Sequence, residues 1–170
     1  YAMKRILVIC GPTATWKTQL GFELAKQFNG EIVSADSRQV YKYMDIGTGK
    51  EWDNEIKIWG YDLVDPKENY SVSDYFNEMK IVIEDVWSRN KLPIIVGGTG
   101  LYIKSLVDGI PTVDIPKNEN LRKSLEKISI EEMFDKLAVL DSSKAASLNS
   151  SDSKNPRRLI RAIEVAVWNI

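Results

Sequence analysis

The sequence has 170 residues, 44% of them hydrophobic, which is enough for one compact α/β domain with a small appendage. Its 23 basic and 24 acidic residues nearly balance, which argues against non-specific coating of nucleic acid but leaves room for a local basic patch. The single cysteine, Cys10, excludes a disulfide framework or thiolate metal cluster, and without histidine a carboxylate becomes the candidate general base. No apolar run approaches the roughly 20 residues that span a bilayer, so we expect no membrane partner. The lone cysteine fits a reducing cytosol, and we expect a cytoplasmic protein that is a monomer.

Apolar patterning predicts alternating strands and helices in the first two thirds of the chain. Strands are predicted at residues 5–10, 31–34 and 93–96, with a less regular one at 57–64. Helical spacing of apolar residues predicts helices at 17–28 and 71–90. This order is typical of βαβ units around a parallel sheet.

The composition changes after Gly109. Residues 110–120 show no regular spacing of apolar residues, and residues 121–140 predict two short helices. Residues 141–154 predict a loop or a short helical turn, and Asn155-Pro156 is a favourable helix start. We therefore expect an α/β core at 1–109, a short helical insertion at 110–154, and a helix at 155–170 that returns to the core.

A near-complete phosphate-loop motif joins the first predicted strand to the first predicted helix. The motif G-x-x-x-x-G-K-[ST] corresponds to Gly11, Pro12, Thr13, Ala14, Thr15, Trp16, Lys17 and Thr18. Backbone N–H groups of such a loop face an anion, Lys17 would reach terminal phosphates, and the Thr18 hydroxyl would hold Mg²⁺. Trp16 stands where the motif has glycine, so we expect a strained loop. The fold class predicted is a P-loop NTPase-like three-layer α/β fold with a central parallel sheet and a small helical appendage.

Polar residues follow two further predicted strands. Asp36 directly follows the second strand, and because ligand crevices lie at the carboxyl ends of parallel strands, we expect it near the phosphate loop as general base. Ser37, Arg38 and Gln39 offer donors and acceptors suited to a base edge, although a solvated turn would have the same pattern. Thr99 follows Gly97-Gly98 and is placed to donate to a phosphate or nucleotide.

The final predicted helix carries a cluster of arginines. Arg157 and Arg161 are four residues apart and share a helix face with Arg158 beside them, which suits contacts with a nucleic-acid backbone. The alternative is an ordinary solvated helix face. Arg122 is a similar but isolated candidate.

Together these motifs resemble the tRNA dimethylallyltransferase family, also called tRNA isopentenyltransferases. The resembling stretches are 11–18, 30–50, 96–102 and 155–165, in family order. Because the family continues past the equivalent of Ile170, we expect this chain to be truncated at its C-terminus or to be a minimal variant. Trp59-Gly-Tyr-Asp-Leu-Val-Asp65 stands where the family has a histidine-containing segment.

The resemblance implies an activity and a set of site residues. Dimethylallyl diphosphate would bind the phosphate loop with Mg²⁺, and its dimethylallyl group would pass to the exocyclic amine of an adenine next to the tRNA anticodon. Such an adenine would be flipped out of the anticodon stem-loop. The catalytic residues implied are Asp36, Lys17, Thr18 and Thr99. The tRNA contacts implied are Asp36, Ser37, Arg38, Gln39, Thr99, Arg122, Pro156, Arg157, Arg158, Leu159 and Ile160.

Three alternatives stay open on the sequence alone. One is an isopentenyltransferase acting on a free adenine nucleotide, which the arginine-rich helix disfavours. Another is a small-molecule kinase, which the absence of a convincing lid segment or acidic Walker-B strand end disfavours. The last is a catalytically silent tRNA- or phosphate-binding module, which Trp16 in the loop favours.

Overall fold

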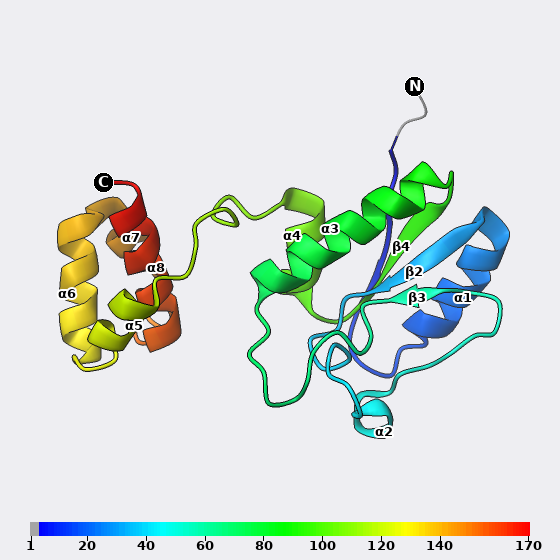
Figure 1. Cartoon of the computed structure of the whole chain (residues 1–170), viewed down its shortest axis with the longest axis horizontal. Helices are drawn as coiled ribbons and strands as arrows, with labels where there is room; N and C mark the ends of the chain where they lie inside the picture. Colours follow the sequence, from blue (N-terminus) through cyan, green and yellow to red (C-terminus); the bar gives the residue numbers. More distant parts are fainter. Residues whose placement is uncertain (1–3) are drawn as a thin grey trace. The chain divides into compact units, whose positions relative to one another are not determined.

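The computed structural model describes residues 4–170, which divide into two compact units at the boundary between Ile110 and Pro111. Figure 1 shows strands and helices in the first unit and helices alone in the second. The first unit contains the strands β1, Leu7–Cys10; β2, Gly30–Ser34; β3, Ile58–Trp59; and β4, Leu92–Gly97. Its helices are α1, Lys17–Phe28; α2, Asp45–Thr48; α3, Val72–Ser88; and α4, Gly100–Asp108.

The strands form one parallel sheet in the order β1-β4-β2-β3. Because side chains alternate along a strand, each strand supplies residues to both faces. Ile32, Ile94 and Val96 pack with α1 in one cluster, whereas Val33 and Ile95 belong to the cluster that contains residues of α3 and α4. The sheet is thus the middle of three layers, and the predicted fold class is confirmed.

The central strands and the two long helices form close to where the sequence predicts them. The capping box of α3 is complete, because Asp74 N–H donates to Ser71 Oγ over 3.3 Å and Ser71 N–H donates to Asp74 Oδ2 over 2.8 Å. The predicted strand at 57–64 is reduced to Ile58–Trp59, because only Ile32 and Val33 of β2 pair with it.

A buried carboxylate ties β2 to the end of α3. Glu31 is 2% exposed, and its carboxylate accepts hydrogen bonds from the side chains of Arg89, Lys91 and Trp59. The Arg89 guanidinium, aided by Lys91 and the Trp59 indole, lowers the pKa of Glu31 to about 2 despite burial. Glu31 therefore stays ionised and stabilises the fold at neutral pH.

The second unit is a small helical bundle of α5, Glu119–Leu125; α6, Ile130–Leu140; α7, Ser142–Ser147; and α8, Pro156–Trp168. Its core includes Leu137, Leu159 and Ile163, all without exposed surface. Residues 155–170 were predicted to return to the core of residues 1–109. In the structure they form one compact unit with residues 111–154, because the apolar stripe of α8 packs on α5 and α6, and their return to the core stays a prediction.

Candidate active site

The phosphate-loop motif forms the turn between β1 and α1. Ala14 has a φ of 61° and Trp16 a φ of 57°, both in the left-handed region that glycine adopts most easily. The backbone thus explains why the motif has glycine at the sixth position. The Trp16 side chain is 79% exposed and adds little to the core.

The loop's own polar groups hold Lys17. Lys17 Nζ donates to the carbonyl of Pro12 and, over 3.2 Å, to Thr15 Oγ1. Thr15 Oγ1 itself donates to the Pro12 carbonyl over 2.9 Å. The ammonium group therefore lies over the loop, where an anion bound by the loop amides would meet it.

Residues 13–18 of the loop and Asp36 line the same cavity, of about 290 Å³, whereas Gly11 and Pro12 line a different hollow. The sequence predicts that these two motifs meet, since both follow carboxyl ends of strands in the same sheet. The cavity is also lined by residues that the sequence did not single out, namely Ile32, Ser34, Thr48, Gly49, Glu51, Tyr61 and Val96. These residues are spread between positions 32 and 96 of the chain, so only the folded structure brings them together around the cavity.

Thr99 holds the segment that carries Asp36. Its Oγ1 accepts a hydrogen bond from Ser37 N–H over 3.0 Å, and its own N–H donates to the carbonyl of Ala35 over 3.0 Å. Arg38 N–H donates to Asp36 Oδ1 over 2.9 Å, which fixes one oxygen of the carboxylate. Thr99 therefore orients the segment around Asp36.

A very close approach of two backbones underlies this arrangement. A Cβ added at Gly97 would lie 2.2 Å from the Ala35 carbonyl oxygen, far inside van der Waals contact. Glycine at the end of β4 thus lets the segment after β2 pass directly beside it.

The side chain of Gln39 is engaged by neighbouring residues of the protein. Its Oε1 accepts from Ser34 Oγ over 2.7 Å, and its Nε2 donates to the carbonyls of Thr48 and Gly49 over 3.1 and 3.2 Å. Both amide hydrogens are used, so Gln39 positions the cavity wall formed by Thr48 and Gly49.

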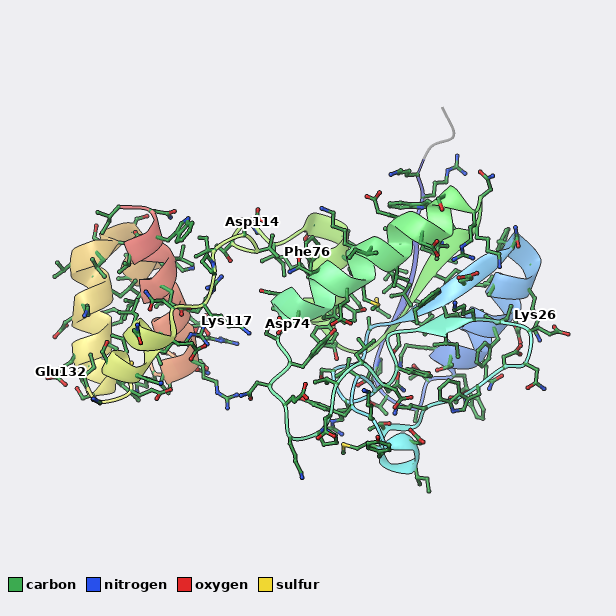
Figure 2. All side chains as sticks on the ribbon, viewed as in Figure 1. Lys26, Asp74, Phe76, Asp114, Lys117 and Glu132 are labelled. Atoms are coloured by element: carbon green, nitrogen blue, oxygen red, sulfur yellow. The ribbon has the colours of Figure 1, made fainter. Side chains whose placement is uncertain are left out.

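Glu51 and Tyr61 form another part of the wall. Gln19 Nε2 donates to Glu51 Oε2 over 2.7 Å, which links this wall to α1. Burial raises the pKa of Tyr61 to about 12, so the phenol stays protonated at neutral pH. Lys26, which Figure 2 labels on α1, forms an ion pair with Asp53 over 3.0 Å and so joins the segment after Glu51 to the same helix.

The donor set of the cavity suits Mg²⁺. Thr18 and Glu51 line it with a hydroxyl and a carboxylate, which are hard oxygen ligands. Within residues 4–170 no cluster of three or more His, Cys, Asp or Glu side chains could hold a metal.

The predicted tRNA contacts in the second unit fall into two groups. Arg157 is exposed, and Arg158 is exposed although it pairs with Asp152. Leu159 has no exposed surface and Ile160 is 9% exposed, so their side chains belong to the core and are not available to a partner. Pro156 is exposed at the start of α8.

Arg122 is engaged by a buried carboxylate. Its Nε and Nη2 donate to the two oxygens of Glu164 over 2.6 and 2.7 Å. Burial alone would raise the pKa of Glu164, but hydrogen bonds from Arg122, Asn118 N–H and Arg161 lower it to about 2. Arg122 and Arg161 therefore stabilise the bundle, a role that the sequence did not reveal because the partner lies 42 residues from Arg122.

A parallel sheet in which β1 leads through a phosphate loop into α1 defines a protein of P-loop NTPase-like fold, and its cavity is lined by residues of that loop and by the Asp36 carboxylate. Two protein-family models match the chain. One described as IPP transferase matches residues 39–169, and one described as isopentenyl transferase matches residues 4–64. The chain belongs to the IPP transferase family.

The chain is also similar in sequence to proteins named as tRNA dimethylallyltransferases. The chain is 43% identical over 168 residues to a tRNA dimethylallyltransferase of Caldanaerobacter subterraneus subsp. tengcongensis, covering 95% of this chain and 52% of the relative. It is 44% identical over 166 residues to one of Finegoldia magna, covering 95% and 53%. The chain thus spans about half the length of the relatives it matches.

The chain is also similar to solved structures. The tRNA isopentenylpyrophosphate transferase of Bacillus halodurans is 37% identical, with a TM-score of 0.63 over 96% of this chain and 55% of that one. A eukaryotic dimethylallyltransferase acting on tRNA is 31% identical, with a TM-score of 0.83 over 96% and 41%. Among residues 4–170, no helix combines the length and apolar character needed to cross a membrane.

Proposed function

We propose that this chain is the catalytic part of a transferase that moves a dimethylallyl group from dimethylallyl diphosphate to the exocyclic amine of an adenine beside the tRNA anticodon. The observation that carries the proposal is that the phosphate loop and Asp36 line one and the same cavity. The relatives named as tRNA dimethylallyltransferases supply the donor and acceptor.

The proposed donor site is the phosphate loop, residues 11–18. Its amides and the N-terminus of α1 bind the diphosphate, and Lys17 turns from the Pro12 carbonyl toward the anion when it arrives. Negative charge grows on the diphosphate as the bond between carbon and oxygen breaks, so Lys17 stabilises the departing group. Mg²⁺, held by Thr18, would neutralise further charge on the same oxygens.

Asp36 is the proposed general base. The adenine amine forms the new carbon–nitrogen bond, and its surplus proton passes to the free carboxylate oxygen of Asp36. Arg38 N–H holds the other oxygen, so the carboxylate is already oriented. Thr99 is proposed as a positioning residue, because its hydroxyl is bonded to the Ser37 backbone.

The proposed RNA contacts outside the cavity are the exposed residues Ser37, Arg38, Pro156, Arg157 and Arg158. Basic side chains suit the phosphate backbone of tRNA. We also propose that the protein acts as a monomer, which size-exclusion chromatography with light scattering would test.

Incubation with labelled dimethylallyl diphosphate and Mg²⁺ tests the proposal. Label in tRNA supports it, label only in AMP favours a free-nucleotide acceptor, and label in neither favours a silent binding module. Asp36→Asn should abolish transfer while leaving diphosphate binding intact. Glu23→Gln, at an exposed carboxylate of α1 outside the cavity lining, is the matched control and should transfer at the wild-type rate.

A further inference from the structure

Trp16 stands at a position where the local structure disfavours it in three ways. Its φ of 57° lies in the left-handed region, which a residue with a Cβ adopts only at a cost. It is the N-cap of α1, yet its side chain makes no capping hydrogen bond, whereas Ser, Thr, Asp or Asn would satisfy a free N–H there. It is also 79% exposed, so burial in the core does not offset these costs. Backbone strain of this kind is typical of positions that contact a ligand.

The exposed indole belongs to the lining of the candidate active site. Trp16 lines the cavity of about 290 Å³ together with Lys17 and Asp36. Two other apolar side chains of the lining offer little surface, because Ile32 is 1% exposed and Val96 is 6% exposed. Trp16 therefore exposes a far larger fraction of its apolar surface than these two residues do.

The polar groups of the cavity suit the two ends of the proposed reaction but not the hydrocarbon chain between them. Lys17 and the loop amides face the diphosphate, and Asp36 faces the adenine amine. The carbon that changes partners must lie between these groups, with the rest of the dimethylallyl chain beside it. Tyr61 also lines the cavity, but its ring already packs edge-to-face with Trp52, with the ring centroids 5.1 Å apart. The chain therefore needs an apolar surface near the loop.

We propose that the indole of Trp16 is the apolar wall against which the dimethylallyl chain of the donor packs. Trp16 directly precedes Lys17, so its side chain begins beside the residue that meets the diphosphate. The hydrocarbon chain starts at an oxygen of that diphosphate and is thus within reach of the indole. This inference rests on the proposed function, which supplies the donor. It makes Trp16 a specificity-determining residue, which adds affinity for a prenyl diphosphate but not for inorganic diphosphate.

The test compares dimethylallyl diphosphate with inorganic diphosphate by isothermal titration of the whole chain, with Mg²⁺ and without RNA. The ratio of the two dissociation constants measures what the hydrocarbon chain contributes, because strain in the loop affects the diphosphate of both ligands alike. In Trp16→Ala the preference for the prenyl ligand should fall roughly 4- to 15-fold, the contribution of one or two buried CH₂ groups. The Kd of inorganic diphosphate should stay close to the wild-type value, since alanine keeps the Cβ at the same backbone position.

Two further variants serve as controls. Trp16→Phe keeps an aromatic ring at the same position and should retain most of the wild-type preference. Phe28→Ala removes a 52% exposed aromatic side chain at the other end of α1, outside the cavity lining, and should leave the preference unchanged. An equal loss in Phe28→Ala, or a loss in Trp16→Phe as large as in Trp16→Ala, would contradict the role assigned to the indole.

Transfer of label to tRNA, measured on the same wild-type protein, separates this inference from the proposed function. If label enters tRNA but Trp16→Ala keeps the wild-type preference, the transfer holds and the inference is wrong. Weaker tRNA binding by that variant would then place the indole against the acceptor base. If the preference falls as expected but no label enters tRNA or AMP, the apolar wall holds and the proposed transfer is wrong. If wild type binds both ligands equally, the inference is overturned, and if it binds neither, both proposals are.

Discussion

Replacing Trp16 with glycine should stabilise the first unit and strengthen diphosphate binding. The φ of 57° places a bulky residue in the left-handed region, at a cost of roughly 1–2 kcal/mol for a non-glycine residue. Glycine removes that cost but brings about 0.5–1 kcal/mol of extra chain entropy in the unfolded state. Because the side chain is 79% exposed, little burial is lost, and a net gain of about 0.5–1 kcal/mol remains.

Trp16→Ala is the matched control, because it removes the same side chain and keeps a Cβ at the strained position. Alanine should therefore match wild type within about 0.5 kcal/mol, as expected for a surface substitution. Glycine should melt higher by up to about 4 °C, since about 1 kcal/mol corresponds to about 2–4 °C in a protein of this size.

The assay is thermal unfolding with hydrogen exchange of the sheet amides, which reports the first unit alone. Isothermal titration of inorganic diphosphate should show a lower Kd for the glycine variant than for the alanine variant, since its loop amides turn toward the anion without strain. Equal melting temperatures for the two variants would refute the argument from backbone strain.

Three further predictions concern buried groups. Because the pKa of Glu31 falls from 4.5 to about 2 on folding, its ionised form contributes about 3 kcal/mol that is present above pH 4.5 and lost as the pH falls toward 2. Glu31→Gln should flatten that part of the acid-unfolding curve, and an unchanged curve would contradict the assignment. Glu164→Gln should lower the melting temperature of the second unit, because Arg122 and Arg161 lose their buried partner. Faster amide exchange in α8 would report this loss, and unaltered exchange would show that the ion pairs of Glu164 do not stabilise the unit. Gly97→Ala should lower the free energy of unfolding by about 3 kcal/mol or more in chemical denaturation, because the new Cβ would lie 2.2 Å from a backbone carbonyl oxygen. Gly98→Ala is the control and should lower it only slightly, because the nearest atom to its new Cβ lies at 3.4 Å. Similar midpoints for these two glycine variants would show that the backbone can relax.

Local sequence determined most of the first unit. The apolar run before Gly97 forms the almost fully buried strand β4, because a central strand of a sheet covered on both faces hides its side chains. The run before Gly11 was expected to be buried as well, but it forms the edge strand β1, in which Leu7, Val8 and Ile9 are half-buried and Cys10 is exposed. The phosphate-loop motif and Asp36 meet as predicted, because parallel strands present their carboxyl ends at one edge.

Only the tertiary structure decided which polar residues are available to a ligand. From the sequence, the Gln39 amide could bind either a base edge or the protein backbone. In the folded protein it donates to the carbonyls of Thr48 and Gly49. Arg122 looks like a free cation in sequence, yet Glu164 becomes its partner only when α5 packs on α8. Hydrogen bonds between residues far apart along the chain depend on packing rather than on local pattern, so sequence predicted the motifs and the fold decided their roles.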